Sequence, residues 1–506
     1  MKTERERMDQ SEAPLLAALE EYKNWDHYGF TPPGHREGRG VDEKTLHAIG
    51  AEAFRSDVLM TGGLDDRKSS RGILKQAEEL MAEAVGADQA FFSTCGSSLS
   101  IKAAMLAVAG GKGQLLVARD VHKSVVAGLV FAGLMPRWVS PSWDTERHIA
   151  HPPSPEAVDE GFARYPRAAG CLIVSPTPYG TCADIAGIAE VCHRHGKPLI
   201  VDEAWGAHLP FHEDLPRWAM DAGADVCVVS VHKMGAGFEQ GSVFHLQGDL
   251  VDSYRLSACA DLLGTTSTNV LILSAIDGWR RHMVGEGHRV LGDALDVARK
   301  LRREIDALPG FHVLEDELLG AESSHDLDRL QILMDISGLD VSGYDAGDWL
   351  REHEGLDLSL FDHDHIQAAL SLADTPETAD RLLASLGRLA DAAPTLPRPK
   401  PVDFPSPHEL ELEPAMPPRE AFFAEAELVD AQDAVGRIAA EQLTPYPPGI
   451  PVVVPGENIN EAVVDYLRSG VEAGMVVPGA QDPSMQKIRV VAHTRLPWAD
   501  QRAPRI

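Results

Sequence analysis

A lysine and an aspartate each follow a short apolar run in the first half of the chain. Lys233 comes just after the run 226–230, and Asp202 ends the run 198–202. Lysine is depleted from the ends of buried strands, and an amine removed from water has a lowered pKa that suits it to Schiff-base formation. A buried carboxylate is costly unless it meets a cation or strong hydrogen-bond donors, so Asp202 is expected to have a charged partner.

Two further runs end in residues that could bind a phosphate or stack on a ring. Ser97 and Ser98 follow the run 89–93 and begin a predicted helix. Free N–H groups and hydroxyls at a helix N-terminus can hold a phosphate, although a plain N-cap explains the same residues. His122 follows the run 114–118, where it could stack on a ligand ring or have only a structural role.

These four features occur in a chain order that fits one cofactor. A phosphate cradle, a ring that can stack, a carboxylate for a pyridinium nitrogen and a Schiff-base lysine are what pyridoxal 5′-phosphate (PLP) needs. Asp202 and Lys233 are 31 residues apart, which suits one strand–helix–strand step. The sequence therefore predicts a PLP-dependent enzyme.

Seven short apolar runs predict the sheet that positions these residues. Turn or polar residues bound each run, and longer segments of helical period lie between them. This alternation is typical of an α/β fold with one large, mostly parallel sheet covered by helices. Ligands of such sheets bind beyond the carboxyl ends of the strands, where the four features lie. The predicted strands are 89–93, 114–118, 137–140, 171–175, 198–202, 226–230 and 242–246.

Composition shifts divide the chain into five predicted parts. A long helix is predicted at 278–301, a dense proline run begins near residue 394, and another helix is predicted at about 424–440. The parts are an N-terminal arm (1–55), a large domain (56–275), a small α/β domain (276–391), a proline-rich linker (392–418) and a C-terminal α+β domain (419–506).

The composition argues against several classes of partner. The 506 residues include 46 Lys and Arg against 77 Asp and Glu, a net charge of −31, and this argues against nucleic acid because phosphate binding relies on clustered cations. No stretch approaches about 18 uncharged apolar residues, so no membrane partner is expected, and the polar N-terminus does not resemble a secretion signal. Six sparse cysteines predict free thiols in a reducing, cytoplasmic compartment.

Two clusters of possible metal ligands are expected to hold no metal. They are Cys182 with residues 192–195, and the run Asp362-His-Asp-His365. Neither has the ligand spacing of a closed zinc site, and PLP chemistry needs no metal.

Five segments resemble one family of PLP enzymes. They are Ser230-Val-His-Lys233, Asp202-Glu-Ala-Trp-Gly206, Thr265-Thr-Ser267, Thr31-Pro-Pro-Gly-His35 and Tyr446-Pro-Pro-Gly-Ile-Pro-Val-Val-Val-Pro-Gly-Glu457. Over about residues 25–480 the chain resembles the Orn/Lys/Arg decarboxylase family of fold-type-I PLP enzymes. The resemblance implies an aspartate-aminotransferase-like large domain, a small domain and a C-terminal domain of the family type. It also implies a homodimer with active sites at the interface, without the N-terminal wing domain of longer members.

The resemblance assigns roles around the cofactor ring. Lys233 would bind PLP as a Schiff base, and Asp202 would bind the pyridine nitrogen. His122 would stack on one face of the ring, with Ala204 against the other. Trp205 would lie near the ring edge.

Further roles follow for the phosphate, the proton and the substrate. The implied phosphate ligands are Ser97, Ser98, Ser230 and His232, with Thr266 and Ser267 reaching the partner subunit's phosphate. Lys233 or His232 would donate the proton to Cα. His35 and Glu457 are candidates for contacts with the substrate or its access path.

The implied reaction is decarboxylation of a basic amino acid, arginine, lysine or ornithine, to agmatine, cadaverine or putrescine and CO2. An acidic chain suits such a cationic substrate. One alternative is another fold-type-I reaction, of the aminotransferase, aldolase or oxidase type, and another is a non-catalytic binding protein with the same fold. Val231 and residues 234–240 and 268–270 depart from the family pattern, so the distal substrate pocket stays open.

Overall fold

A seven-stranded sheet forms the centre of the fold. The computed structural model describes residues 8–25, 28–60, 64, 72–111, 113–320 and 322–492. The strands are β1 (Gln89–Ser93), β2 (Gln114–Ala118), β3 (Met135–Val139), β6 (Cys171–Val174), β8 (Leu199–Asp202), β9 (Val226–Ser230) and β10 (Ser242–Leu246). Their order is β1-β10-β9-β8-β6-β2-β3, with β10 antiparallel to both neighbours and the other pairs parallel. All seven predicted strands are confirmed, each within two residues of its predicted bounds.

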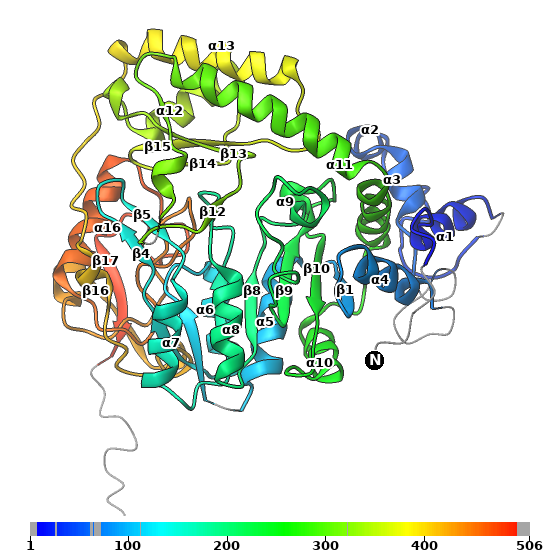
Figure 1. The fold of residues 1–506 in the computed structure, drawn as a ribbon, viewed down its shortest axis with the longest axis horizontal. Coiled ribbons are helices and arrows are strands. Elements are labelled where there is room, and N and C mark those ends of the chain that lie inside the picture. Colours follow the sequence, from blue (N-terminus) through cyan, green and yellow to red (C-terminus); the bar gives the residue numbers. More distant parts are fainter. Residues whose placement is uncertain are drawn as a thin grey trace, which may run out of the picture.

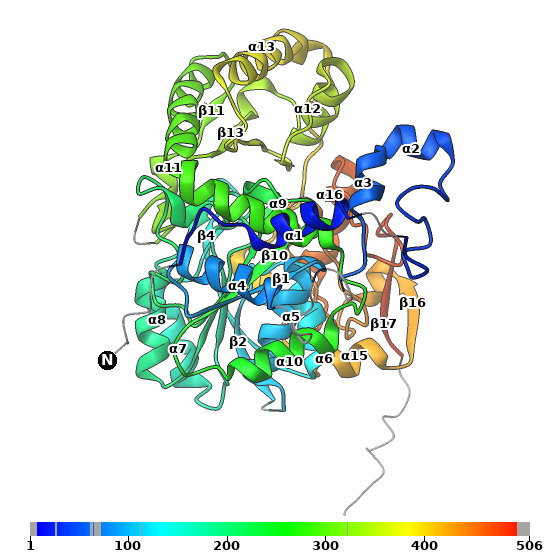
Figure 2. The same ribbon diagram turned by 90° about the vertical axis from the view of Figure 1, so that its right-hand side faces the viewer.

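Helices cover both faces of this sheet. They are α4 (Ile73–Ala84), α5 (Gly96–Ala109), α6 (Lys123–Ala132), α7 (Pro155–Arg164), α8 (Ile185–Arg194), α9 (Val231–Met234) and α10 (Ser253–Leu263). Figures 1 and 2 show α7 and α8 on one face and α5, α6 and α10 on the other. Because both faces are covered, the inner strands are apolar almost throughout, and every residue of β8 and β9 is buried.

A long helix, α11 (Val270–Asp306), joins the large domain to a small domain. It has 37 residues and passes through the predicted domain boundary at 275/276. The small domain has an antiparallel sheet in the order β11-β13-β15-β14, beneath α11 and α13 at the top of Figure 1. Its elements are β11 (His312–Val313), β13 (Gln331–Asp335), β14 (Leu360–Phe361), β15 (His365–Ala369), α12 (Gly343–Trp349), a π-helical turn (Leu350–Glu354) and α13 (Pro376–Ala392).

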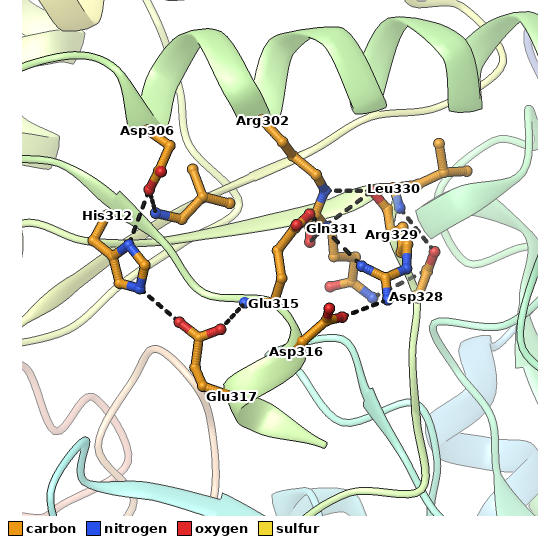
Figure 3. Close-up of polar contacts among 11 residues, drawn as sticks. Arg302, Asp306, His312, Glu315, Asp316, Glu317, Asp328, Arg329, Leu330 and Gln331 are labelled. Atoms are coloured by element: carbon orange, nitrogen blue, oxygen red, sulfur yellow. Dashed lines mark hydrogen bonds and ion pairs between the residues drawn. The ribbon is translucent and has the colours of Figure 1, made fainter. Parts of the chain in front are cut away.

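Polar contacts of Arg302 tie α11 to the small-domain sheet (Figure 3). The buried guanidinium donates from Nη2 to the carbonyl oxygens of Arg329 (3.0 Å) and Gln331 (2.6 Å), and Nη1 pairs with Glu315 (2.9 Å). A buried cation is tolerated only when its donors are satisfied in this way. These bonds therefore fix the small domain on the helix that also packs against the large domain.

The C-terminal part has its own hydrophobic core and lies against the large domain (orange and red in Figure 1). Its elements are the 3₁₀ turn Ala393–Thr395, α14 (Pro407–Leu410), α15 (Pro418–Phe423), β16 (Ala426–Asp430), the 3₁₀ turn Ala431–Ala434, α16 (Glu461–Ala473) and β17 (Lys487–Val491). The predicted helix at 424–440 is wrong. This segment holds β16, which pairs antiparallel with β17 far along the chain, and that pairing outweighs the local helix preference.

The described residues of the N-terminal arm form three helices, none of which the sequence analysis predicts. They are α1 (Pro14–Lys23), α2 (Glu43–Ile49) and α3 (Ala51–Ser56). α1 packs on α4 and α11, and Leu15 N–H donates to Asp277 of α11 (2.9 Å). The remaining short strands are β4 (Ser142–Asp144), β5 (Ile149–His151), β7 (Thr181–Cys182) and β12 (Asp326–Leu327). Within the ranges described, no helix is both long enough and apolar enough to cross a bilayer.

Candidate active site

The four strands that precede the predicted site residues all end at the same edge of the sheet. β1, β2, β8 and β9 run in the same direction, so their carboxyl ends lie together. Asp202 is the last residue of β8, and Lys233 lies in α9, directly after β9. His122 caps α6 after β2, and Ser97 lies in the first turn of α5 after β1. The fold thus brings the four features predicted from sequence to a common edge.

Lys233 presents a buried amine beside an aromatic ring. Its Nζ atom lies 4.3 Å from the centroid of the Trp205 ring. Burial lowers the pKa of Lys233, and the nearby Asp202 carboxylate opposes this shift. A lowered pKa increases the fraction of neutral amine, which is the form that attacks a carbonyl carbon.

Asp202 is a buried carboxylate with an unused acceptor. The residue is 4% exposed, and its Oδ1 atom has no hydrogen-bond partner within the part of the chain that the structure describes. Burial raises the pKa of Asp202 to about 6, against the opposing charge of Lys233. A protonated ring nitrogen at Oδ1 would supply the missing donor and favour the carboxylate form. The residue therefore fits the pyridine nitrogen of PLP.

His122 is a neutral ring held at one edge. Its Nδ1 atom accepts the N–H of Ser124 (3.2 Å) and lies 2.9 Å from the Ser124 hydroxyl. Burial, reinforced by the charges of Lys233 and Lys123, lowers the pKa of His122 to about 4. A neutral imidazole with a fixed edge is suited to packing its face on a flat ligand.

Hydroxyl groups gather at the N-terminus of α5. Ser230 Oγ and Ser97 Oγ are 2.8 Å apart, Ser97 is half-buried and Ser98 is exposed. The N-cap residue is Cys95, and it makes no side-chain cap bond, so the plain N-cap explanation of the serines does not hold. Unclaimed N–H groups of the first helical turn together with hydroxyls can hold a phosphate.

His232 is the residue before Lys233, and Ala204 lies two residues after Asp202. His232 Nδ1 donates to the carbonyl of Gly241 (3.2 Å), and because a carbonyl only accepts, Nε2 remains an acceptor in the neutral ring. Ala204 follows β8, is 8% exposed, and its N–H supports the Asp202 carboxylate.

Three other predicted residues lie elsewhere in the single chain. Thr266 and Ser267 are exposed between α10 and α11. His35 lies in the N-terminal arm, where Nε2 is 3.2 Å from Asp57. Their predicted roles toward the cofactor phosphate and the substrate stay predictions.

Glu457 is buried where the C-terminal part contacts the large domain. The sequence analysis instead expected it to face the substrate or its access path. Its side chain is 2% exposed, and Oε2 is 3.2 Å from Arg119 Nη2. Oε2 also accepts the N–H of Val454 (2.8 Å). Because this carboxylate already has a cation, it links the C-terminal part to the large domain and is not free to bind a substrate cation.

Two features near His122 have no counterpart in the sequence-based predictions. Asp120 is buried, burial raises its pKa to about 7, and neither carboxylate oxygen has a partner among the described residues. Its place just after an apolar strand was a usable signal. The second feature is the turn 445–449, where Gly449 O accepts the N–H of Lys123 (3.2 Å). Nothing in the sequence near either segment predicts a contact between two such distant parts of the chain.

Comparison with known proteins decides the family. The description "Orn/Lys/Arg decarboxylase, major domain" matches residues 13–328, and "Orn/Lys/Arg decarboxylase, C-terminal domain" matches residues 404–487. The chain belongs to the Orn/Lys/Arg decarboxylase family. An arginine decarboxylase of Halalkalibacterium halodurans is 37% identical over 483 residues, covering 95% of this chain and 98% of the relative. An arginine decarboxylase of Bacillus subtilis is 35% identical and covers 96% and 99%.

Solved structures agree with the fold expected of this family. Lysine decarboxylase A from Pseudomonas aeruginosa has a TM-score of 0.78 at 23% identity, over 95% of this chain and 80% of that chain. The constitutive lysine decarboxylase of Escherichia coli has a TM-score of 0.78 at 20% identity, over 96% and 82%. The predicted fold-type-I architecture is confirmed. As a member of the Orn/Lys/Arg decarboxylase family, the protein is a PLP-dependent decarboxylase of basic amino acids, which confirms the predicted cofactor and reaction class.

Proposed function

We propose that the protein decarboxylates arginine to agmatine and CO2. The two relatives described above are arginine decarboxylases, and each aligns over nearly its whole length. The observation that carries the chemistry is the buried Lys233 amine near Asp202, whose Oδ1 atom is unpaired in the described part of the chain. A net charge of −31 favours a cationic substrate.

In the proposed mechanism Lys233 and Asp202 act on different atoms of the cofactor. Bound PLP supplies an electron sink for the electron pair that loss of CO2 leaves at Cα. Asp202 holds a proton on the pyridine nitrogen, because a buried carboxylate favours an adjacent positive charge. Lys233 would hold the cofactor through Nζ, and its amine, once free, would deliver a proton from Nζ to Cα.

The neighbouring residues orient the cofactor in this proposal. His122 would pack its neutral ring on one face, Ala204 would lie against the other, and Trp205 would lie near the ring edge. His232 is the second candidate for donating the Cα proton, a role that requires a proton on Nε2 because Nδ1 donates to Gly241. The phosphate would be held by the hydroxyls of Ser97, Ser98 and Ser230, and by His232 when its Nε2 carries a proton.

We further propose a cytoplasmic homodimer in which Thr266 and Ser267 reach the partner subunit's phosphate. Both residues are exposed in the single chain. The N-terminal arm also exposes Trp25 (60%) and Phe30 (89%), and large exposed aromatic side chains are typical of protein interfaces. All six cysteines are unpaired, which fits a reducing compartment.

Mixed dimers test whether Thr266 and Ser267 act across the interface. Two variants are needed: Lys233→Ala, and a double variant with Thr266→Asp and Ser267→Asp that places carboxylates where the phosphate is expected. Like-charge repulsion should make the double-variant homodimer at least about a hundredfold less active. If Thr266 and Ser267 act across the interface, a purified heterodimer of the two variants has one site with both sets of substitutions and one site with none. About half of the wild-type activity should then return. A heterodimer as inactive as its parents would show that the residues act within their own subunit.

Release of CO2 from carboxyl-labelled arginine, lysine and ornithine, assayed in parallel, tests the substrate. The PLP-loaded protein should have a kcat/KM for arginine at least about a hundredfold above the other two, because polar groups that bind a guanidinium are left unpaired by a shorter or simpler amine. CO2 from lysine or ornithine instead would replace the proposed substrate. Formation of a keto acid without CO2 would overturn the proposed reaction.

A further inference from the structure

The edge of the His122 ring that is not held by its own helix faces a glycine of the C-terminal part. A Cβ atom at Gly449 would lie 3.3 Å from His122 Cδ2 and the same distance from two ring atoms of Tyr446. Such a contact is tighter than a relaxed carbon–carbon contact of about 3.5–4.0 Å. Gly449 also has a φ of +89°, which L side chains rarely adopt. Glycine alone therefore allows this close approach without strain.

Backbone hydrogen bonds hold Gly449 against the ring. Gly449 O accepts the N–H of Lys123, the residue after His122, at 3.2 Å. Gly449 N–H donates to the carbonyl of Pro445 at 3.0 Å and closes the turn. The Lys123 ammonium lies 5.5 Å from the centroid of the Tyr446 ring, over the same turn. The glycine thus has little freedom to move away from His122.

A second set of contacts holds the loop on the other side of His122. Arg119 donates to the carbonyl of Val452 at 2.8 Å, and it pairs with Glu457 at 3.2 Å. Both atoms of this ion pair are buried. The C-terminal part therefore contacts the loop 119–123 before and after His122, and the position of the ring depends on that docking.

We infer that Gly449 is a positioning residue for His122. Because glycine has no side chain, the turn 445–449 can contact the free edge of the His122 ring. This contact sets the plane of the ring against which PLP would pack. This inference rests on the proposed role of His122 beside the cofactor. A methyl group at position 449 must push aside Tyr446, which is 47% exposed, or His122, or both. Since the Ser124 contacts fix Nδ1, displacement at Cδ2 tilts the ring and weakens its packing on the cofactor.

Comparison of Gly449→Ala with Gly436→Ala tests the inference. Gly436 lies in the same C-terminal part with a φ of +77°, and a Cβ there would meet nothing within 4 Å. Both variants carry a similar backbone cost, but only Gly449→Ala crowds His122. Titration of the apoprotein with PLP, followed by tryptophan fluorescence and by the visible absorbance of the bound cofactor, measures the Kd. We expect the Kd to rise about tenfold for Gly449→Ala and less than about twofold for Gly436→Ala.

The His122→Ala background shows whether the glycine acts through the ring. His122→Ala alone should weaken PLP binding about tenfold, and adding Gly449→Ala should change the Kd by less than about twofold, because the crowded contact is gone. If Gly449→Ala alone has a lower Tm, the Kd values are compared below that Tm, where the double variant should still match His122→Ala although it keeps the positive φ and the crowding of Tyr446. Equal effects of the two glycine variants, or full additivity with His122→Ala, would overturn the inference. Failure of the wild-type protein to bind PLP would instead overturn the proposed function on which it rests.

Discussion

Replacing Lys233 by alanine should lower kcat for CO2 release on the order of 10⁴-fold or more, because the variant loses the amine that holds the cofactor and delivers the Cα proton. The fold should survive. The substitution leaves a small cavity beside Trp205 and removes the cation near Asp202, so the Tm of the apoprotein should fall by a few degrees while the protein stays folded. Release of labelled CO2 at saturating PLP, with calorimetry of the apoprotein, measures both effects.

Lys233→Arg separates the chemistry of the amine from its charge. Arginine keeps a cation near Asp202 but cannot be deprotonated to a nucleophile, so this variant should be as inactive as Lys233→Ala. A matched control is Lys300→Ala, which removes an exposed lysine of α11 that pairs only with Glu304 and Asp380 among the described residues, and should keep full activity. A Lys233→Arg protein with a near-normal rate would show that the residue supplies charge alone.

Asp202→Asn should lower kcat about 10³-fold, comparable to the loss of a preorganised electrostatic group in other active sites. A neutral amide does not favour a proton on the pyridine nitrogen, so the cofactor accepts the electron pair from Cα less well. The variant fills nearly the same volume, and the buried Oδ1 has no partner within the described ranges to lose. Steady-state kinetics at saturating PLP, with the cofactor content measured by absorbance, isolate the effect on kcat.

Asp225→Asn is the matched control for that substitution. Asp225 is also buried, but it precedes β9 at the opposite edge of the sheet, where Oδ2 accepts the N–H of Leu199 (2.8 Å). Its replacement should lower stability and leave kcat within about twofold of wild type. An Asp202→Asn enzyme with full cofactor content and an unchanged kcat would contradict the role given to Asp202.

The strands and the main site features were predictable because their signals are local. Each strand of the large sheet is a short apolar run with polar ends, and a strand buried on both faces needs such a run. Asp202 and Lys233 stand out because charged side chains rarely end such strands. Parallel pairing then brings their strand ends together without any further information.

The features that prediction missed depend on contacts between distant segments. The segment 424–440 has a helix-like composition, but β16 forms there because β17 lies beside it. Glu457 was predicted to contact the substrate or line its access path because nothing near it in the sequence predicts its ion pair with Arg119. The approach of Gly449 to His122 likewise follows from the docking of the C-terminal part, which the sequence does not specify locally.

The most direct test is to find where PLP is attached. Borohydride reduction of the PLP-loaded protein fixes the lysine–cofactor bond, and proteolysis with mass spectrometry identifies the modified residue. We expect one label per chain, on Lys233, and none at that position in Lys233→Arg. A label on a different lysine, or an unlabelled protein that still releases CO2 from arginine, would contradict the assignment of Lys233 as the residue that binds PLP.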